Sequence, residues 1–343
     1  MSLRETLAAV RHVDHHAHSL MRTGPRDLDE FRGLFCETRD PRQWPHVATS
    51  VTYQQAIPLL SSYLGCEPTE RGVFAHRSVH DPEEYAAALL RAAGADVVLV
   101  DEGYPPAAEA LTTAELGRLA QCDTRPVLRI ETVASGDGDG DGHGFGDAAR
   151  AQLADARDAG FAALKTIIAY RGGLDFDALP DAARARLTTA LEVNEAGGDP
   201  LPVQIHTGFG DPDLLLPRAD PSYLKPLFER FPDTSFVLLH CYPFVREAGW
   251  LASVYPNVFL DLSLTIPHVS QPAAALAEAV ELAPLSKLLY ASDAVRTPEL
   301  YLLAAVWWRD ALAGVLSELL PERAAEAGAR LILRENALRL YRL

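Results

Sequence analysis

Short apolar runs alternate with helix-like segments along most of the chain. The strand-like runs lie at residues 12–18, 97–102, 126–133, 162–168, 202–206, 236–241, 258–263 and 288–292. Segments with Ala, Leu, Glu and Arg at three-to-four spacing separate most of them, at 107–121, 147–159, 178–195, 222–231, 271–281 and 298–313. Such alternation predicts βαβ units, and eight units in 343 residues predict a single-domain α/β fold over 1–343, a closed (β/α)8 TIM barrel.

A long gap separates the first and second predicted strands. We expect residues 21–92 to form a helical insertion, with helices over 27–36, 51–64 and 82–94. Asp81 suits the N-cap of the last helix, Pro82 its first position, and Glu84 completes a capping box. Because the insertion leaves the carboxyl end of strand one, it should lie over the barrel mouth. It could serve there as a lid that shapes the substrate pocket or as an oligomerisation surface.

A Gly- and Asp-rich segment follows the third predicted strand, from Ser135 to Gly146. Its Asp-x-Asp-x-Asp-Gly opening is similar to the start of a calcium loop. The twelfth position is Ala148, however, so the bidentate Glu that closes an EF-hand is missing. The pattern favours a loop without calcium.

Composition narrows the class of protein. A formal net charge of -16 argues against nucleic-acid binding, which needs a basic surface. No apolar run approaches the ~18 residues of a membrane span, and charged residues near the N-terminus break any signal-peptide core. The four cysteines form no Cys-x-x-Cys pair, which fits reduced thiols. We therefore expect a cytoplasmic enzyme with a small-molecule substrate, whose final helical segment, 321–343, packs on the barrel or on a second subunit.

Histidines and an aspartate end four of the apolar runs. His16 and His18 lie two residues apart on the first run, where side chains at i and i+2 share a side. His206, His240 and Asp293 each follow a later run, and the carboxyl ends of parallel strands meet at one end of a barrel. The sequence therefore predicts a shared metal site.

Neutral imidazoles and a carboxylate suit a divalent ion that activates water. We expect His16, His18, His206 and Asp293 to bind it. Zinc is the default, manganese and iron also fit the N/O ligands, and one ion is favoured over two. His240 could be a further ligand or could hydrogen-bond substrate or water, the second role being favoured. Strand alternation predicts that His15 points away from the pair, and that Asp14 lies beside it and orients a ligand histidine.

These residues resemble the metal centre of the amidohydrolase superfamily, through Asp14-x-His16-x-His18, His206, His240 and Asp293. Over roughly residues 10 to 315, the stretches 204–211, 239–243 with 246–249, and 292–293 with 298–300 are similar to the amidohydrolase-2 type of domain. That domain precedes a glutamine synthetase-like domain in FluG and nodulin-type fusions, so we expect here the stand-alone barrel. The resemblance implies that Asp293 binds the metal, takes a proton from the attacking water and passes it to the leaving group.

Further charged and aromatic residues fall at or near strand ends. Lys165 is a charge within an apolar strand; in some amidohydrolases a strand-four lysine is carboxylated and bridges two metals, whereas a neutral or paired lysine is favoured here. Arginines at the mouth would suit a carboxylate-bearing substrate, although salt bridges between loops explain them equally well. The candidates for substrate contact are Arg129, Glu131, Arg171, Tyr242 and Arg246.

The favoured function is a metal-dependent hydrolase that breaks an amide or other C-N bond of a small carboxylated compound. A decarboxylase of an aromatic acid on the same scaffold is the alternative, since the motifs do not separate the two chemistries. A non-catalytic binding module is a third reading, and the complete set of metal-ligand types argues against it.

Overall fold

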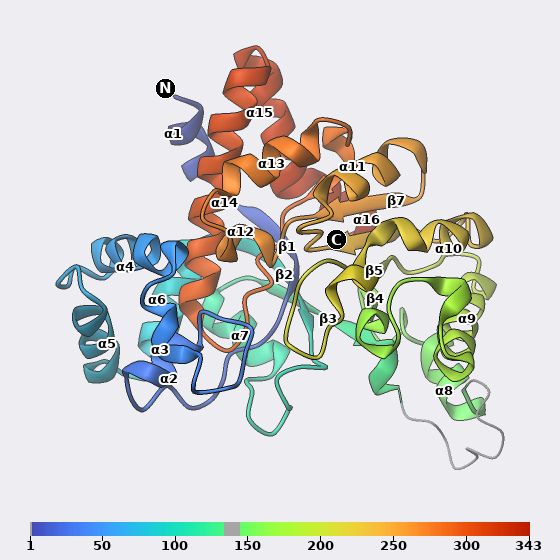
Figure 1. The fold of residues 1–343 in the computed structure, drawn as a ribbon, viewed down its shortest axis with the longest axis horizontal. Helices are drawn as coiled ribbons and strands as arrows, with labels where there is room; N and C mark the ends of the chain where they lie inside the picture. The colour runs from blue at the N-terminus through green and yellow to red at the C-terminus, as the bar shows by residue number, and fades with distance from the viewer. Residues whose placement is uncertain (1, 134–144) are drawn as a thin grey trace.

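The computed structural model describes residues 2–133 and 145–343. Its parallel strands are hydrogen-bonded in chain order and form one eight-stranded sheet that curls into a barrel, which confirms the predicted TIM barrel (Figure 1). The predicted Gly-Asp loop falls largely on residues 134–144, outside the described residues. The strands are β1 (His12–Ala17), β2 (Ala95–Asp101), β3 (Asp123–Arg129), β4 (Ala163–Thr166), β5 (Val203–His206), β6 (Phe236–Leu239), β7 (Val258–Asp261) and β8 (Leu288–Leu289).

Backbone hydrogen bonds just beyond β8 join the two ends of the sheet. Asp293 N donates to His16 O at 3.0 Å, and His18 N donates to Ala294 O at 2.9 Å. A single parallel bridge between Leu20 and Arg296 continues this pairing. The seam of the barrel therefore lies beside the residues for which a metal site is predicted.

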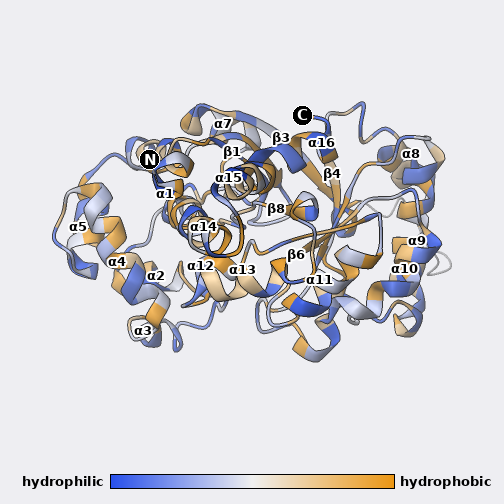
Figure 2. Cartoon of the chain, turned by 90° about the horizontal axis from the view of Figure 1, so that it is seen from above, coloured by the Kyte–Doolittle hydropathy of each residue, from blue (hydrophilic) through white to orange (hydrophobic). Residues whose placement is uncertain are grey.

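Each strand is followed by a helix on the outside of the barrel. Strand β6 is hydrophobic and buried throughout, as expected for a covered parallel strand, whereas the first half of β3 is partly exposed (Figure 2). The outer helices are α6 (Pro82–Ala93), α7 (Thr113–Ala120), α8 (Asp147–Ala154), α9 (Asp181–Ala196), α10 (Lys225–Arg230), α11 (Val245–Val254), α13 (Pro272–Val280) and α14 (Pro298–Leu319), with the short α12 (Thr265–His268) before α13.

The helical insertion after β1 stands at one side of the barrel (Figure 1). It contains α2 (Leu28–Gly33), α3 (Trp44–Val47), α4 (Val51–Leu64) and α5 (Glu70–Val79). Asp81 caps α6 by accepting from the backbone of Glu83 and Glu84, although the reciprocal Glu84 contact of a capping box is not formed. Helix α6 packs against α7 and α14 and so belongs to the outer ring of the barrel.

Helix α14 is the longest helix of the described residues, and most of its side chains are buried. By length and composition alone it could cross a membrane, but 72% of its most apolar window is buried inside the protein. Trp308, in its middle, is fully buried and donates its indole N–H to Ala291 O. A core helix of a globular domain has the same properties.

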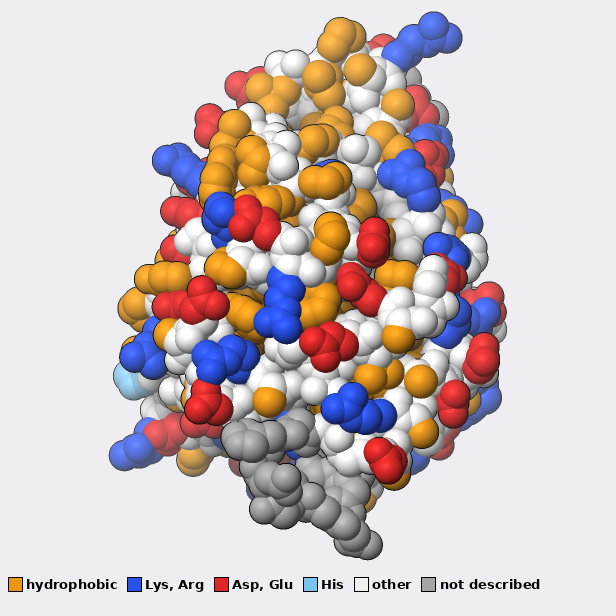
Figure 3. Space-filling model, turned by 90° about the vertical axis from the view of Figure 1, so that its right-hand side faces the viewer, with side chains coloured by type: hydrophobic (Ala, Val, Ile, Leu, Met, Phe, Trp, Pro, Cys, Tyr) orange, Lys and Arg blue, Asp and Glu red, His pale blue; other side chains and the backbone are white. Residues whose placement is uncertain are grey.

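The terminal segments pack on the barrel. Helix α1 (Leu3–Ala8), which we did not predict, lies against α14, and α15 (Glu322–Arg330) continues through a π-helical turn, Leu331–Glu335, into α16 (Asn336–Tyr341). The buried Tyr341 hydroxyl lies 3.0 Å from His15 Nδ1 inside the barrel, so the final segment contacts the sheet of its own chain. On the face over α8, α9 and α10, acidic and basic side chains are interspersed with apolar ones (Figure 3).

Candidate metal centre

The carboxyl ends of the strands surround a cavity of about 540 Å³. Polar side chains from several strand ends and from the loops that follow them line it. Of the predicted site residues, the lining includes His18, Arg129, Lys165, Arg171, His206, His240 and Asp293. His16 lies directly beneath them, fully buried, with Nε2 3.0 Å from Asp293 Oδ1. The structure therefore brings the predicted residues to one end of the barrel. The ligand atoms that lie within 4.8 Å of one another are those of His16, His240 and Asp293, and those of His16, His18 and Asp101, so His240 takes the place expected for His206 in the tighter cluster.

Hydrogen bonds fix the tautomers of the first two histidines. His18 Nδ1 lies 3.0 Å from each of the carbonyl oxygens of Asp101 and Tyr104, so Nδ1 must carry the proton. His16 Nδ1 lies 2.8 Å from the Gln204 side-chain oxygen and is a donor for the same reason. The side-chain amide of Gln204 in turn donates to His15 O, which fixes its orientation. In the neutral imidazoles both Nε2 atoms then present lone pairs.

Asp293 faces these lone pairs with lone pairs of its own. Its Oδ1 lies 3.0 Å from His16 Nε2 and 3.4 Å from His18 Nε2 and has no hydrogen-bond donor among the described residues. Lys165 Nζ offers a hydrogen to His16 Nε2 at 3.1 Å but leaves Asp293 Oδ1 without a donor. Acceptors so close together and so deeply buried repel one another unless a proton or a cation lies among them. A divalent cation would satisfy all three atoms at once.

His206 and His240 complete the ring of imidazoles. Their ring centroids lie 4.4 Å apart, and the buried His206 Nε2 has no hydrogen-bond partner in the described part of the chain. His240 Nδ1 lies 2.8 Å from Ser263 Oγ and 3.7 Å from Asp293 Oδ2. An orphaned imidazole nitrogen and an orphaned carboxylate oxygen that belong to the same buried site fit a metal ion that the donor set would hold.

Burial keeps these histidines neutral. It lowers the pKa of His16 to about 4, with a further contribution from the nearby Lys165, and it lowers the pKa of His206 and His240 well below the ordinary value. Neutral imidazole is the form that binds metals. The protonation states as well as the positions therefore suit a cation.

Asp101, at the end of β2, is a site residue that the sequence analysis missed. It groups with His16 and His18 as possible ligands, and Arg129 binds it with Nε and Nη2 at 3.1 and 2.6 Å. Burial opposes its ionisation, but Arg129 and other neighbouring cations hold the pKa of Asp101 below its usual range. The sequence pattern that identifies His206 also identifies Asp101, because both residues end an apolar run. Lys165 Nζ lies close to both Asp101 and His16, at 3.8 Å from Asp101 Oδ2 and 3.1 Å from His16 Nε2.

The expected orientations of Asp14 and His15 are wrong. The register of β1 is irregular between Asp14 and Ala17, and this breaks the alternation on which the prediction rested. Asp14 accepts hydrogen bonds from Ser292 N at 3.0 Å and Ser292 Oγ at 2.6 Å, so it fixes the turn before Asp293. His15 remains inside the barrel, where its Nε2 lies 2.9 Å from Asp261 Oδ2.

The predicted substrate residues divide into two groups. Arg129 and Arg171 line the cavity, whereas Glu131, Tyr242 and Arg246 do not. Glu131 turns back to accept from Thr166 Oγ1 and Ile167 N. Tyr242 packs near Phe209, with ring centroids 6.0 Å apart. Arg246 is exposed and pairs with Glu278 of α13, so these three residues make contacts outside the cavity lining.

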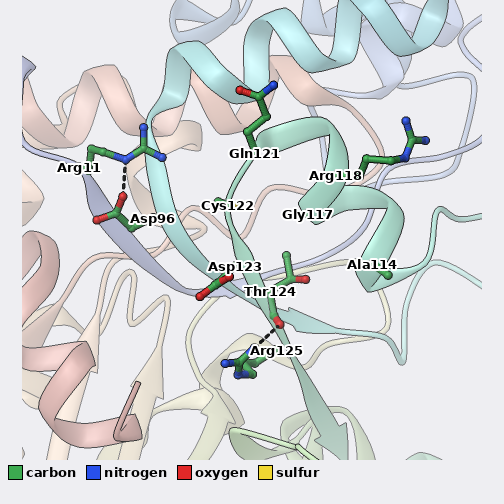
Figure 4. Close-up of a pocket in the computed structure, with 10 residues that line it drawn as sticks. All are labelled: Arg11, Asp96, Ala114, Gly117, Arg118, Gln121, Cys122, Asp123, Thr124 and Arg125. Carbon is green, nitrogen blue, oxygen red and sulfur yellow. Dashed lines mark hydrogen bonds and ion pairs between the residues drawn. The ribbon is translucent and has the colours of Figure 1, made fainter.

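A second hollow lies at the opposite end of the sheet (Figure 4). It is formed around the first residues of β2 and β3, where Asp96 pairs with Arg11 and Arg125 donates to Thr124 O. In TIM barrels this amino-terminal end contributes to stability, while the carboxyl end carries the chemistry. We therefore place the functional site in the cavity that contains the histidines.

Comparisons with known proteins agree with this geometry. The family model described as amidohydrolase matches residues 13–343. Protein fluG of Emericella nidulans is 36% identical over 231 residues, which are 56% of this chain and 26% of that protein, so the chain spans a small part of this curated relative.

The similarity to solved structures extends over nearly the whole chain. A candidate metal-dependent hydrolase from Lactobacillus casei is 26% identical, with a TM-score of 0.85 over 99% of this chain and 97% of its own. A uronate isomerase from Thermotoga maritima has the same fold, with 12% identity and a TM-score of 0.65 over 99% of this chain and 96% of its own. The fold, the buried His/Asp clusters and the family match together show that this chain belongs to the amidohydrolase family.

Proposed function

We propose that the protein is a metal-dependent hydrolase of an amide or other C-N bond in a small carboxylated compound. The observation that carries this proposal is the pair of buried atoms without partners, His206 Nε2 and Asp293 Oδ1, in the site where His16, His240 and Asp293 offer ligand atoms within 4.8 Å of one another. Three imidazole nitrogens and one carboxylate oxygen form the ligand set of a hydrolytic metal centre.

The proposed ligands are His16, His18 and His206 through Nε2, and Asp293 through Oδ1. Zinc is the first choice for this N/O set, and manganese or iron are the alternatives. When bound, such an ion would polarise the substrate carbonyl and lower the pKa of water. The cavity leaves space for water and substrate above the ligands, which a purely structural metal site does not need.

Asp293 Oδ2 is the proposed proton carrier. This oxygen faces His240 at 3.7 Å rather than the ligand nitrogens of β1. It would accept a proton from the attacking water and return it to the leaving nitrogen, while His240 holds substrate or water by a hydrogen bond. We propose one ion, with Lys165 remaining an uncarboxylated amine beside His16.

Metal analysis of protein purified without chelator tests the first part of the proposal. We expect about one equivalent of transition metal per chain and, if Lys165 stays unmodified, no second equivalent after incubation with bicarbonate. His206→Ala should lose the metal yet remain folded by circular dichroism, whereas the exposed His46→Ala should retain it. Wild-type metal content in His206→Ala would contradict the assignment.

Product analysis tests the reaction. Metal-loaded enzyme is incubated in ¹⁸O-labelled water with a panel of amides and of aromatic carboxylates. Hydrolysis predicts one labelled oxygen in the carboxylate product and a released amine. Carbon dioxide from an aromatic acid, without label in the remaining product, would instead establish the decarboxylase.

A further inference from the structure

The rim of the metal cavity carries both basic and acidic side chains that are not paired with each other. Arg39, Arg171, Asp211 and Asp213 all line the cavity and are exposed. None of the four forms an ion pair within the described residues. The neighbouring Asp40 and Glu37 lie instead beside Arg42 and His268. These four are therefore the charges at the rim that remain available to a ligand.

The basic side of the rim is built from two loops. Arg39 follows α2 in the insertion, and its guanidinium lies 4.9 Å from the centroid of the Tyr104 ring, which holds it over the cavity by a cation–π contact. Arg171 ends the 3-10 turn after β4. Deeper in the wall, Arg296 has a buried Nε without a hydrogen-bond partner in the described chain, while its Nη2 donates to Cys36 O. A carboxylate bound here would meet planar donors.

The acidic side of the rim is a turn that lies close to the proposed metal ligand His206. The turn after β5 places Gly210 so near the site that an added Cβ would lie 3.0 Å from His206 Nε2. Tyr170 Oη accepts from Asp211 N at 3.3 Å and ties this turn to the loop that carries Arg171. Asp211 Oδ1 accepts from Asp213 N, so the two carboxylates belong to one turn. An ammonium group is the natural partner of this pair.

The charged residues of the rim lie at the surface, whereas the proposed metal ligands lie at the buried floor of the cavity. Lys165, His206 and Asp293 at the floor are 1%, 6% and 8% exposed, whereas the four rim residues lie at the surface. A ligand that spans this distance would place its charged end at the rim and its reacting bond at the floor. A cavity of about 540 Å³ accommodates a molecule of amino-acid or dipeptide size.

We infer that the substrate is a zwitterionic amino acid whose side chain carries the scissile amide, an inference that rests on the proposed hydrolase function. Both α groups are free in such a compound. The α-carboxylate binds the Arg39 and Arg171 side of the rim, the α-ammonium binds the Asp211 and Asp213 side, and the side-chain amide reaches the floor. Hydrolysis adds one water to give a carboxylate and an ammonium product, with no other reactant required.

Matched amides test the inference. The metal-loaded enzyme is assayed with glutamic acid γ-(4-nitroanilide), aspartic acid β-(4-nitroanilide) and Nε-acetyl-lysine, each also in an α-N-acetyl and an α-carboxamide form. We expect kcat/KM to fall at least about tenfold when either α charge is removed, as one lost charge-assisted contact predicts. Equal rates on free and blocked forms would overturn the inference but leave the hydrolase standing. Hydrolysis of none of the panel, by enzyme that holds metal, would overturn both.

Rim variants assign each charge to its partner. Asp211→Asn should lower kcat/KM for the free substrates mainly through KM, and have little effect on the α-N-acetyl forms. Arg171→Gln should do the same for the carboxylate. The exposed Asp233→Asn and Arg323→Gln, which lie outside the cavity lining, are the matched controls. If Asp211→Asn and Arg171→Gln leave the preference for free over blocked forms unchanged, the rim does not bind the α-carboxylate and α-ammonium groups.

Discussion

Replacing Gly210 by alanine should weaken metal binding without unfolding the barrel. Gly210 is not among the residues with positive φ, so its backbone tolerates a side chain. The new Cβ, however, would lie 1.9 Å from Tyr170 Oη and 3.0 Å from both Cε1 and Nε2 of His206. Ordinary contacts are about 3.4–4 Å, so the hydroxyl must retreat by roughly 1.5 Å. Because the Tyr170 and His206 rings lie 4.7 Å apart, we expect this displacement to disturb a proposed metal ligand.

Changes that disturb the support of a ligand typically reduce metal affinity by about 10–100-fold, and we expect a loss of that size here. Zinc affinity is measured by competition with a chromophoric chelator, and folding by circular dichroism. Gly314→Ala is the matched control: nothing lies within 4 Å of its added Cβ in α14, so it should keep wild-type affinity. The double variant Gly210→Ala, Tyr170→Phe removes the closest clash and should recover part of the loss. Wild-type zinc affinity in Gly210→Ala would refute the reasoning.

Two further predictions concern buried carboxylates outside the ligand set. Asp14→Asn loses an acceptor for Ser292 and should reduce zinc affinity about tenfold by loosening the turn before Asp293; unchanged affinity in the same competition assay would contradict this role. Glu299→Ala leaves the partly buried Arg77 without its carboxylate partner, and it should lower the free energy of unfolding, measured by urea titration, by about 3–5 kcal/mol. The control Glu30→Ala, which breaks a pair with the exposed Arg26, should lower it by at most about 1 kcal/mol. Similar losses of unfolding free energy in Glu299→Ala and Glu30→Ala would show that the buried pair contributes no more to stability than the exposed one.

The sequence predicted the barrel and the residues at its strand ends because both follow from local patterns. Helix 51–64 has the predicted bounds, since Ser50 caps its start and Gly65 ends it in the left-handed conformation. Strand β8 is shorter than expected, at Leu288–Leu289, and the segment after it, which carries Asp293, is joined to β1 only by separate backbone hydrogen bonds such as that from Asp293 N to His16 O. Periodicity identifies an apolar run but does not show how many of its residues pair with a neighbour.

The substrate residues were harder to predict because they lie on loops. A strand fixes the direction of its side chains by alternation, whereas a loop directs them according to the partners that it meets in the folded protein. Arg171 and Arg246 both follow strands, yet Arg171 lines the cavity and Arg246 reaches Glu278 on the outside. The charges of Arg39 and Asp211 escaped notice for the same reason, since no pattern in the sequence relates the insertion to the turn after β5.

Residues of the candidate metal centre have strained backbone conformations. His240, Cys241 and Asp293 have φ values of 68°, 66° and 48°, in the left-handed region that residues with side chains rarely adopt. Each such residue costs on the order of 1–3 kcal/mol and persists only where the surroundings enforce it. Here His240 N donates to Asp261, and Asp293 N donates to His16 O. Because these bonds come from neighbouring strands, the barrel holds the two side chains in place before any ligand arrives, which is the preorganisation that metal-assisted hydrolysis requires.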